Sequence, residues 1–337
     1  MDAGYRNASS VLACALLLGS CRVAGNLGPP QQIGAAFATE GPAQTAFRDA
    51  SGGPVRWQSH SFVVDEAVAR EPTALGEVTS LDDVRFSEKS AGTGLWRPQE
   101  FARITHPGVY FLQPYDLTKM PVLFVHGING SPANFTYLVN RLDRTRFQPW
   151  VYSYPSGEQL GAIADHLNDT MDELQRRYRF GPFAVVAHSM GGLVSRGFIL
   201  RRARVPGNDA IPLFISISTP WDGHSAAEIG SKYVPEVKVW RDLVPGSDYL
   251  KSLFAAPLPA QTRYYLLFTF NRKKGSFGTS GDHTVTVASQ LSAPAQQEAV
   301  RLIGYDDTHS GVLRDAAVSS RLNQLLDDTF KRSSRPP

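Results

Sequence analysis

The feature that most constrains this chain is a serine set among small residues, between a strand-like segment and a helix-like segment. Residues 187–192 read AHSMGG, after the apolar segment 183–186 and before a helical pattern over 193–202. A strand and a helix nearly touch across such a turn, so only small side chains fit beside the serine, and a strained backbone exposes its hydroxyl. Ala187 stands where this motif usually has glycine. The sequence therefore predicts a nucleophile elbow with Ser189 at its tip.

From residue 121 onward, apolar segments of strand length alternate with helical patterns. Many of these segments are apolar on both faces, which is typical of parallel strands covered by helices on both sides. Expected strands span 122–125, 150–154, 183–187, 212–217, 264–269 and 299–303, and expected helices span 132–142, 158–178 and 193–202. Upstream, we expect strands at 62–64 and 109–112 and a turn packed by Trp96 at 95–98. The pattern predicts an α/β fold with a mostly parallel central sheet.

A serine hydroxyl needs a base within hydrogen-bond reach and an acid that orients this base. On an elbow fold the acid and then the histidine follow the serine, on loops after later strands. His309 lies past the last expected strand, and Asp282 follows the strand at 264–269 in a turn rich in glycine and serine. We therefore expect Ser189, Asp282 and His309 to form a catalytic triad.

Other acidic residues compete for the role of the acid. Asp222, after the strand at 212–217, is the main rival of Asp282. Asp306 and Asp307 are close to His309 in sequence, but we interpret them as loop or capping carboxylates.

Seven other histidines compete for the role of the base. His188 adjoins Ser189, and its side chain is expected to point away from the reacting centre. His126 belongs to the turn after the first parallel strand, and His283 adjoins the expected acid. His224 is a candidate for the lining of the pocket, and the remaining three are expected to be structural or exposed: His60, His106 and His166. No histidine pair has the spacing of a zinc site, so we expect no metal and no cofactor.

Acyl transfer builds negative charge on the substrate carbonyl oxygen, and backbone N–H groups must point at this oxygen. Met190 follows the nucleophile at a helix N-terminus and is expected to supply one N–H group. The turn after the first parallel strand, which reads VHGING over 125–130, is expected to supply the other. We therefore predict Gly127, Ile128 and Met190 as oxyanion and substrate-binding residues, with Ile128 N–H as the second donor.

These segments together resemble the lipase and esterase branch of the α/β-hydrolase family, over about residues 108–330. The resemblance rests on FVHG at 124–127, AHSMGG at 187–192, Thr219-Pro220, Gly281-Asp282-His283 and Thr308-His309-Ser310. It implies an α/β-hydrolase fold and cleavage of carboxylic esters through an acyl-enzyme intermediate. Bacterial lipases, and membrane-bound deacylases that act on lipid-anchored glycans, share the HSMGG form. These motifs do not specify a substrate.

An insertion of about forty residues lies between Trp221 and Gln261. In the family that the chain resembles, this position often holds a cap or lid over the pocket. Extra helices packed on the core are the alternative. Either arrangement is expected to shape an apolar pocket for the acyl chain.

The N-terminus has the pattern of a targeting segment. A single Arg6 precedes the apolar stretch 11–18, which is too short to span a membrane permanently. Residues 18–21 read LGSC, which resembles the lipobox of bacterial lipoproteins, in which the cysteine is lipidated. Such proteins often carry Asp after the cysteine when they stay in the inner membrane, whereas Arg22 follows Cys21 here. The resemblance implies a lipid anchor in the outer membrane, facing the periplasm; a plain secretory signal with a chance cysteine is the alternative.

The organisation that we predict has four parts. They are a lipoprotein signal peptide at 1–20, a flexible tether rich in glycine and proline at 21–54, an N-terminal extension at 55–107 and an α/β-hydrolase domain at 108–332 with a cap-like insertion at 221–261. The 34 basic and 31 acidic residues give a net charge of only +3, which argues against nucleic-acid binding.

The interpretation that these features favour is a lipid-anchored serine hydrolase of carboxylic acyl esters. An acyltransferase or a thioesterase is the alternative on the same triad, because both proceed through an acyl-enzyme intermediate. A non-catalytic lipoprotein that uses the scaffold for binding is an alternative from a different class. The expected partners are a small-molecule or lipid acyl ester and a membrane.

Overall fold

The computed structural model describes residues 73–205, 211–271 and 281–330. The expected signal peptide, the tether, Cys21 and the expected strand at 62–64 lie outside the described residues.

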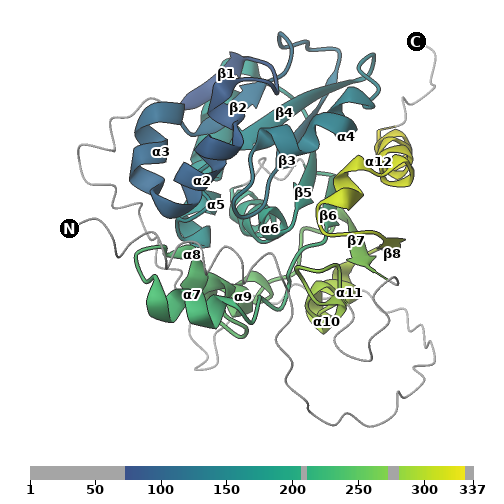
Figure 1. The fold of residues 1–337 in the computed structure, drawn as a ribbon. Helices are drawn as coiled ribbons and strands as arrows, with labels where there is room; N and C mark the ends of the chain where they lie inside the picture. Colours follow the sequence, from purple (N-terminus) through teal and green to yellow (C-terminus); the bar gives the residue numbers. More distant parts are fainter. Residues whose placement is uncertain (1–72, 206–210, 272–280, 331–337) are drawn as a thin grey trace, which may run out of the picture.

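In the described part of the chain, eight strands form one sheet (Figure 1). Their order is β1-β2-β4-β3-β5-β6-β7-β8; β2 runs antiparallel to β4, and the other neighbours run parallel. The carboxyl ends of β3 to β8 therefore meet at one edge, which is where open α/β sheets bind ligands. The strands are β1 Ala74–Val78, β2 Gly108–Phe111, β3 Met120–Val125, β4 Phe147–Ser153, β5 Ala184–His188, β6 Leu213–Ile217, β7 Arg263–Phe270 and β8 Arg301–Asp306.

Helices cover both faces of the sheet, and the strands alternate their side chains between the two faces. Leu123 and Val125 of β3 join a core shared with α5 and α6, whereas Val122 and Phe124 join a second core shared with α4 and α12. The α-helices are α2 Glu88–Trp96, α3 Pro98–Thr105, α4 Thr136–Asn140, α5 Leu160–Tyr178, α6 Met190–Arg202, α7 Ala227–Tyr233, α8 Val239–Leu243, α9 Asp248–Leu253, α10 Val287–Gln290, α11 Ala293–Glu298 and α12 Ala316–Thr329. The 3₁₀ helices are η1 Val84–Phe86, η2 Pro132–Phe135 and η3 Gly311–Arg314.

The predicted fold class, a mostly parallel sheet with helices on both faces, is confirmed. The expected turn at 95–98 is wrong in its detail: Trp96 ends α2, and Pro98 takes the first position of α3, where its missing N–H group costs nothing. The expected helix at 132–142 begins as the 3₁₀ helix η2 before α4 continues it. The strand β1 lies upstream of residue 108, so part of the predicted N-terminal extension belongs to the sheet.

The segment 221–261 contains α7, α8 and α9, which lie together near α6 (Figure 1). The Asp242 carboxylate accepts a hydrogen bond of 2.7 Å from the Leu160 N–H group at the start of α5. Arg196 of α6 is fully buried and donates from Nε to Leu253 O at 2.7 Å. The segment is thus packed on the core helices α5 and α6.

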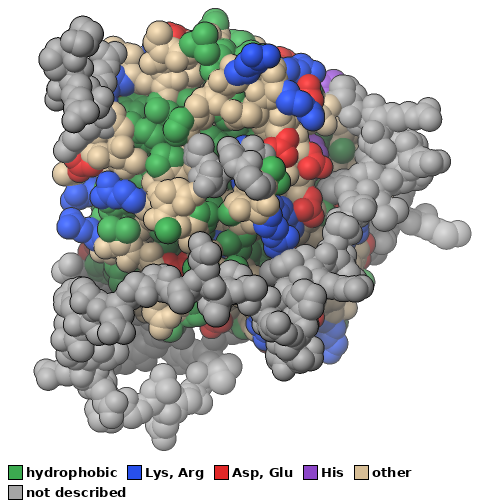
Figure 2. Space-filling model, turned by 180° about the vertical axis from the view of Figure 1, so that it is seen from behind, with side chains coloured by type: hydrophobic (Ala, Val, Ile, Leu, Met, Phe, Trp, Pro, Cys, Tyr) green, Lys and Arg blue, Asp and Glu red, His purple; other side chains and the backbone are tan. Residues whose placement is uncertain are grey.

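On the face shown in Figure 2, basic and acidic side chains are interspersed among hydrophobic and polar ones. Helices that combine the length and the apolar character needed to span a bilayer are absent from residues 73–205, 211–271 and 281–330.

Candidate active site

Ser189 lies at a sharp turn between β5 and α6, at the carboxyl edge of the sheet. Its backbone has φ 53° and ψ −132°, a strained conformation for a residue with a side chain. Ser189 N–H donates to Ile217 O of the neighbouring strand β6 at 2.8 Å, and this bond holds the turn in place. The geometry is that of a nucleophile elbow.

Other groups lie so close to the glycines around the elbow that a side chain at these positions would clash with them. A Cβ atom at Gly191 would lie 2.3 Å from Val125 O, and one at Gly192 would lie 2.0 Å from Thr219 Oγ1. A Cβ atom at Gly127 would lie 2.8 Å from Ser189 Cβ and 3.2 Å from its Oγ. The turn after β3 therefore lies directly against the serine.

His309 follows β8, and Asp282 follows β7. The structure places His309 Nδ1 at 2.7 Å from Asp282 Oδ2, and His309 N–H donates to Asp282 O at 3.0 Å. Both side chains are buried. The Nδ1 atom thus faces the carboxylate, which leaves Nε2 as the ring atom available to a proton donor.

The Asp282 carboxylate is fully buried and accepts five hydrogen bonds. Burial alone raises the pKa of this group, but the hydrogen bonds from His309 and Thr269 and the backbone hold its pKa below the ordinary value. Asp282 is therefore ionised near neutral pH. Its donors are His309 Nδ1, Thr269 Oγ1 at 2.5 Å, Gln290 Nε2 at 3.3 Å, Thr284 N at 3.0 Å and Val285 N at 2.8 Å.

The hydrogen bonds of the described residues do not include one between Ser189 Oγ and the His309 ring. Catalytic hydrogen bonds are often long in structures without substrate and tighten in the complex. The elbow and the loop that carries His309 are nevertheless adjacent. The ring of His188, the residue before Ser189, has its centroid 4.8 Å from that of the His309 ring. The prediction that His188 points away from the reacting centre is therefore wrong.

Two backbone N–H groups are available beside Ser189. Met190 N–H is at the amino end of α6, and Ile128 N–H is in the turn after β3; over the described ranges, no hydrogen bond uses either donor. A helix N-terminus favours negative charge, so Met190 N–H is suited to an anionic oxygen. These are the two groups predicted as oxyanion donors, and this role stays a prediction.

Two residues of the loop after β4 hold the turn after β3 in place. Tyr154 donates its hydroxyl proton to His126 O, and its ring stacks on the His126 ring with centroids 4.1 Å apart. Asn129 N–H donates to Ser156 Oγ at 3.0 Å. Burial lowers the pKa of His126 to about 4, so its ring is neutral near pH 7. His126 is therefore a structural residue of this turn.

The rival acids lie elsewhere or have other roles. Asp222 is exposed, and its backbone N–H donates to Ser289 O at 3.3 Å. Asp307 accepts from Thr308 N at 2.6 Å, as expected for a capping carboxylate. Neither side chain is hydrogen-bonded to His309 among the described contacts, whereas Asp282 is.

Sequence reasoning missed the residues that surround Asp282. Thr269 lies at the end of β7, and Gln290 lies in α10; both are buried and donate to the carboxylate. Nothing in the local pattern marks either residue, because a threonine at a strand end and a glutamine in a short helix are ordinary.

Among the described residues, no group of three or more His, Cys, Asp or Glu side chains is placed so that it could hold a metal ion.

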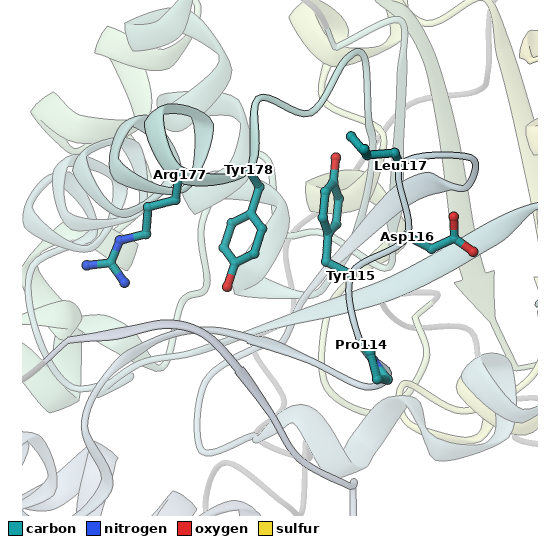
Figure 3. Close-up of a pocket in the computed structure, with 6 residues that line it drawn as sticks. All are labelled: Pro114, Tyr115, Asp116, Leu117, Arg177 and Tyr178. Atoms are coloured by element: carbon teal, nitrogen blue, oxygen red, sulfur yellow. The ribbon is translucent and has the colours of Figure 1, made fainter.

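A pocket of about 610 Å³ lies at the opposite edge of the sheet (Figure 3). It is lined by residues of the β2–β3 loop and of the end of α5, where the amino ends of the parallel strands lie: Pro114, Tyr115, Asp116, Leu117, Arg177 and Tyr178. The pocket is therefore separate from Ser189, and we do not assign it to the reaction.

Comparisons with known proteins bear on the fold. The sequence profile of the α/β-hydrolase fold matches residues 120–236. The structure is similar to the mature lipase BlEst2 of Bacillus licheniformis, with a TM-score of 0.50, 17% identity, and coverage of 65% of this chain and 97% of that chain. It is also similar to lipase B of Aspergillus fumigatus, with a TM-score of 0.47, 15% identity, and coverage of 65% and 56%. No curated protein sequence is significantly similar to this chain.

The profile match and the sheet together identify the fold as that of an α/β hydrolase. The profile covers β3 to α7, and therefore includes the turn at Gly127 and the elbow at Ser189.

Proposed function

We propose that the protein is a serine hydrolase of the esterase and lipase type, which cleaves carboxylic acyl esters through Ser189, His309 and Asp282. The observation that carries this proposal is the convergence at one sheet edge of a strained serine, a buried His–Asp pair and two unused backbone donors. The fold supports it, because serine esterases and lipases use this arrangement. The similarity to BlEst2, described as a lipase, is consistent with the same class.

In the proposed mechanism, Ser189 Oγ attacks the carbonyl carbon of the ester while His309 Nε2 accepts the hydroxyl proton. The N–H groups of Ile128 and Met190 stabilise the oxyanion that forms. The imidazolium is stabilised by the ionised Asp282 and then protonates the leaving alcohol. Water, activated by His309, cleaves the acyl-enzyme and releases the acid.

The substrate that we propose is an uncharged or lipid-like acyl ester. The oxyanion donors are neutral backbone groups, and the segment 221–261, which packs on α6, is rich in apolar residues. Each methylene buried on binding contributes about 0.8 kcal/mol, a factor of about four in affinity. Because the acyl chain is buried in both the ground state and the transition state, this factor is expected mainly in KM.

The corresponding experiment is a panel of p-nitrophenyl esters from acetyl to dodecanoyl, with and without lipid dispersions. We expect KM to fall with chain length, so that esters of medium length exceed the acetyl ester in kcat/KM. Activity restricted to the acetyl ester would contradict the lipid-like substrate. Absence of hydrolysis across the whole panel would contradict the esterase function itself.

An acyltransferase or a thioesterase is the second candidate, because the same acyl-enzyme can react with an alcohol or amine, or form from a thioester. Adding a primary alcohol or amine at millimolar concentration separates hydrolysis from transfer: a transferase converts most of the ester to the new acyl product, whereas a hydrolase releases free acid.

We also propose that Cys21 is lipidated and anchors the mature protein at the periplasmic face of the bacterial outer membrane. The support is the sequence LGSC at 18–21 after a short apolar stretch, with Arg22 following. Cys21→Ser is expected to move the protein from the membrane fraction to the soluble fraction on cell fractionation. An unmodified mature N-terminus at another residue, found by mass spectrometry, would contradict this proposal.

A further inference from the structure

His188 joins the elbow to the loop that carries His309. Its side chain is buried, and its Nε2 lies 2.8 Å from His309 O. The two rings are tilted by 48° with centroids 4.8 Å apart. Through this contact, the residue that precedes Ser189 touches both the main chain and the ring of the proposed base.

The protonation state of His188 follows from its surroundings. Burial, with a smaller effect of the nearby His309, lowers the pKa of His188 to about 3, so the ring is neutral near pH 7. A carbonyl oxygen only accepts hydrogen bonds, so the single ring proton of His188 is on Nε2 and points at His309 O. A neutral ring at this place adds no positive charge beside His309 when His309 accepts a proton.

Three hydrogen bonds hold His309 in place. Its N–H group and its Nδ1 both bond to Asp282, which ties it to the turn at 281–286. Its carbonyl oxygen bonds to His188, which ties it to the elbow. Within the described residues, this third bond is the only hydrogen bond between the elbow at 187–192 and the loop at 307–311. His188 therefore links the elbow directly to the main chain of His309, in addition to the bonds that hold His309 to Asp282.

We propose that His188 is a positioning residue that sets the distance between Ser189 Oγ and His309 Nε2 by holding His309 O. This inference rests on the proposed serine hydrolase function. A misplacement of about 1 Å between reacting groups costs about 100-fold in rate, so loss of the bond is expected to lower kcat and leave substrate binding unchanged.

The test compares His188→Leu, which keeps the bulk and removes the donor, with His188→Gln, whose amide nitrogen can replace Nε2. For His188→Leu we expect kcat to fall about 10- to 100-fold, with KM within about twofold of the wild-type value. For His188→Gln we expect kcat to return to within about fivefold of wild type, because the hydrogen bond is restored.

His166→Leu is the matched control. The His166 ring, on α5, is hydrogen-bonded to Tyr152 Oη at 2.9 Å, and burial lowers its pKa to about 4. This variant loses a neutral imidazole that is partly buried, whereas His188→Leu loses one that is buried. We expect a lower melting temperature but a kcat within about twofold of wild type.

Three results would overturn the inference while the proposed function stands. They are a wild-type kcat in His188→Leu, an equal loss in His188→Gln and His188→Leu when both are folded, and an equal loss of kcat in His166→Leu. Failure of the proposed function is recognised separately, because the wild-type protein would then hydrolyse no ester and react with no fluorophosphonate.

Discussion

Ser189→Ala is expected to lower the rate of ester hydrolysis by about 10⁴-fold or more while the protein remains folded. The substitution removes only Oγ, the atom that forms the acyl-enzyme, and keeps the Cβ that already fits the strained turn. Steady-state assays with the most reactive ester of the panel measure the rate, and circular dichroism and the melting temperature measure the fold.

Ser218→Ala is the matched control for this variant. Ser218 is a buried serine that directly follows the neighbouring strand β6 and also has a positive φ, of 53°. Its hydroxyl is hydrogen-bonded to the Thr269 hydroxyl. We expect a much smaller loss of activity for Ser218→Ala than for Ser189→Ala. Substantial hydrolysis by folded Ser189→Ala would contradict the assignment of the nucleophile.

Asp282→Asn is expected to lower kcat by about 10⁴-fold, the loss found when the orienting carboxylate of such a triad becomes an amide. The neutral amide stabilises the imidazolium of His309 less than the carboxylate does. Its oxygen is expected to keep the two backbone donors that Asp282 Oδ1 has, so that its NH₂ group, a donor, faces Nδ1. The variant is measured in the ester assay beside the wild type, with its melting temperature as a check on folding.

Asp222→Asn is the natural comparison, because Asp222 was the main rival for the role of the acid. Its side chain is exposed, so we expect kcat within about twofold of the wild-type value. A larger loss in Asp222→Asn than in Asp282→Asn would mean that the acid has been misassigned.

Much of the fold could be predicted from the sequence because its parallel strands are short apolar segments. Residues 122–125 and 213–217 are buried on both faces, and this pattern is visible without a structure. The strand β2 was predicted, at 109–112, but its antiparallel direction and the edge strand β1 were not. Gly76 in β1 and the register shift beside it weaken any periodic pattern, and the pairing of β1 with β2 joins segments separated by η1, α2 and α3.

Some residues of the candidate site could likewise be predicted from the sequence, and others could not. Ser189 and the turn at Gly127 could be located because close packing restricts the residues next to them in the sequence to small ones. This restriction is visible as a short local motif. Thr269 and Gln290 could not be located, because their role depends on three elements that meet around Asp282. His188 was misplaced for the same reason: its partner, His309, is 121 residues away in the chain.

The assignment of Ser189 as the activated nucleophile is tested most directly by treating the wild-type protein with a fluorophosphonate and locating the covalent adduct. Peptide mass spectrometry should find one phosphonylated residue, Ser189, because only an activated serine beside oxyanion donors reacts rapidly with such a probe. Prior incubation with an ester substrate should slow the labelling. An unlabelled protein that is folded, or an adduct on a serine other than Ser189, would contradict the account.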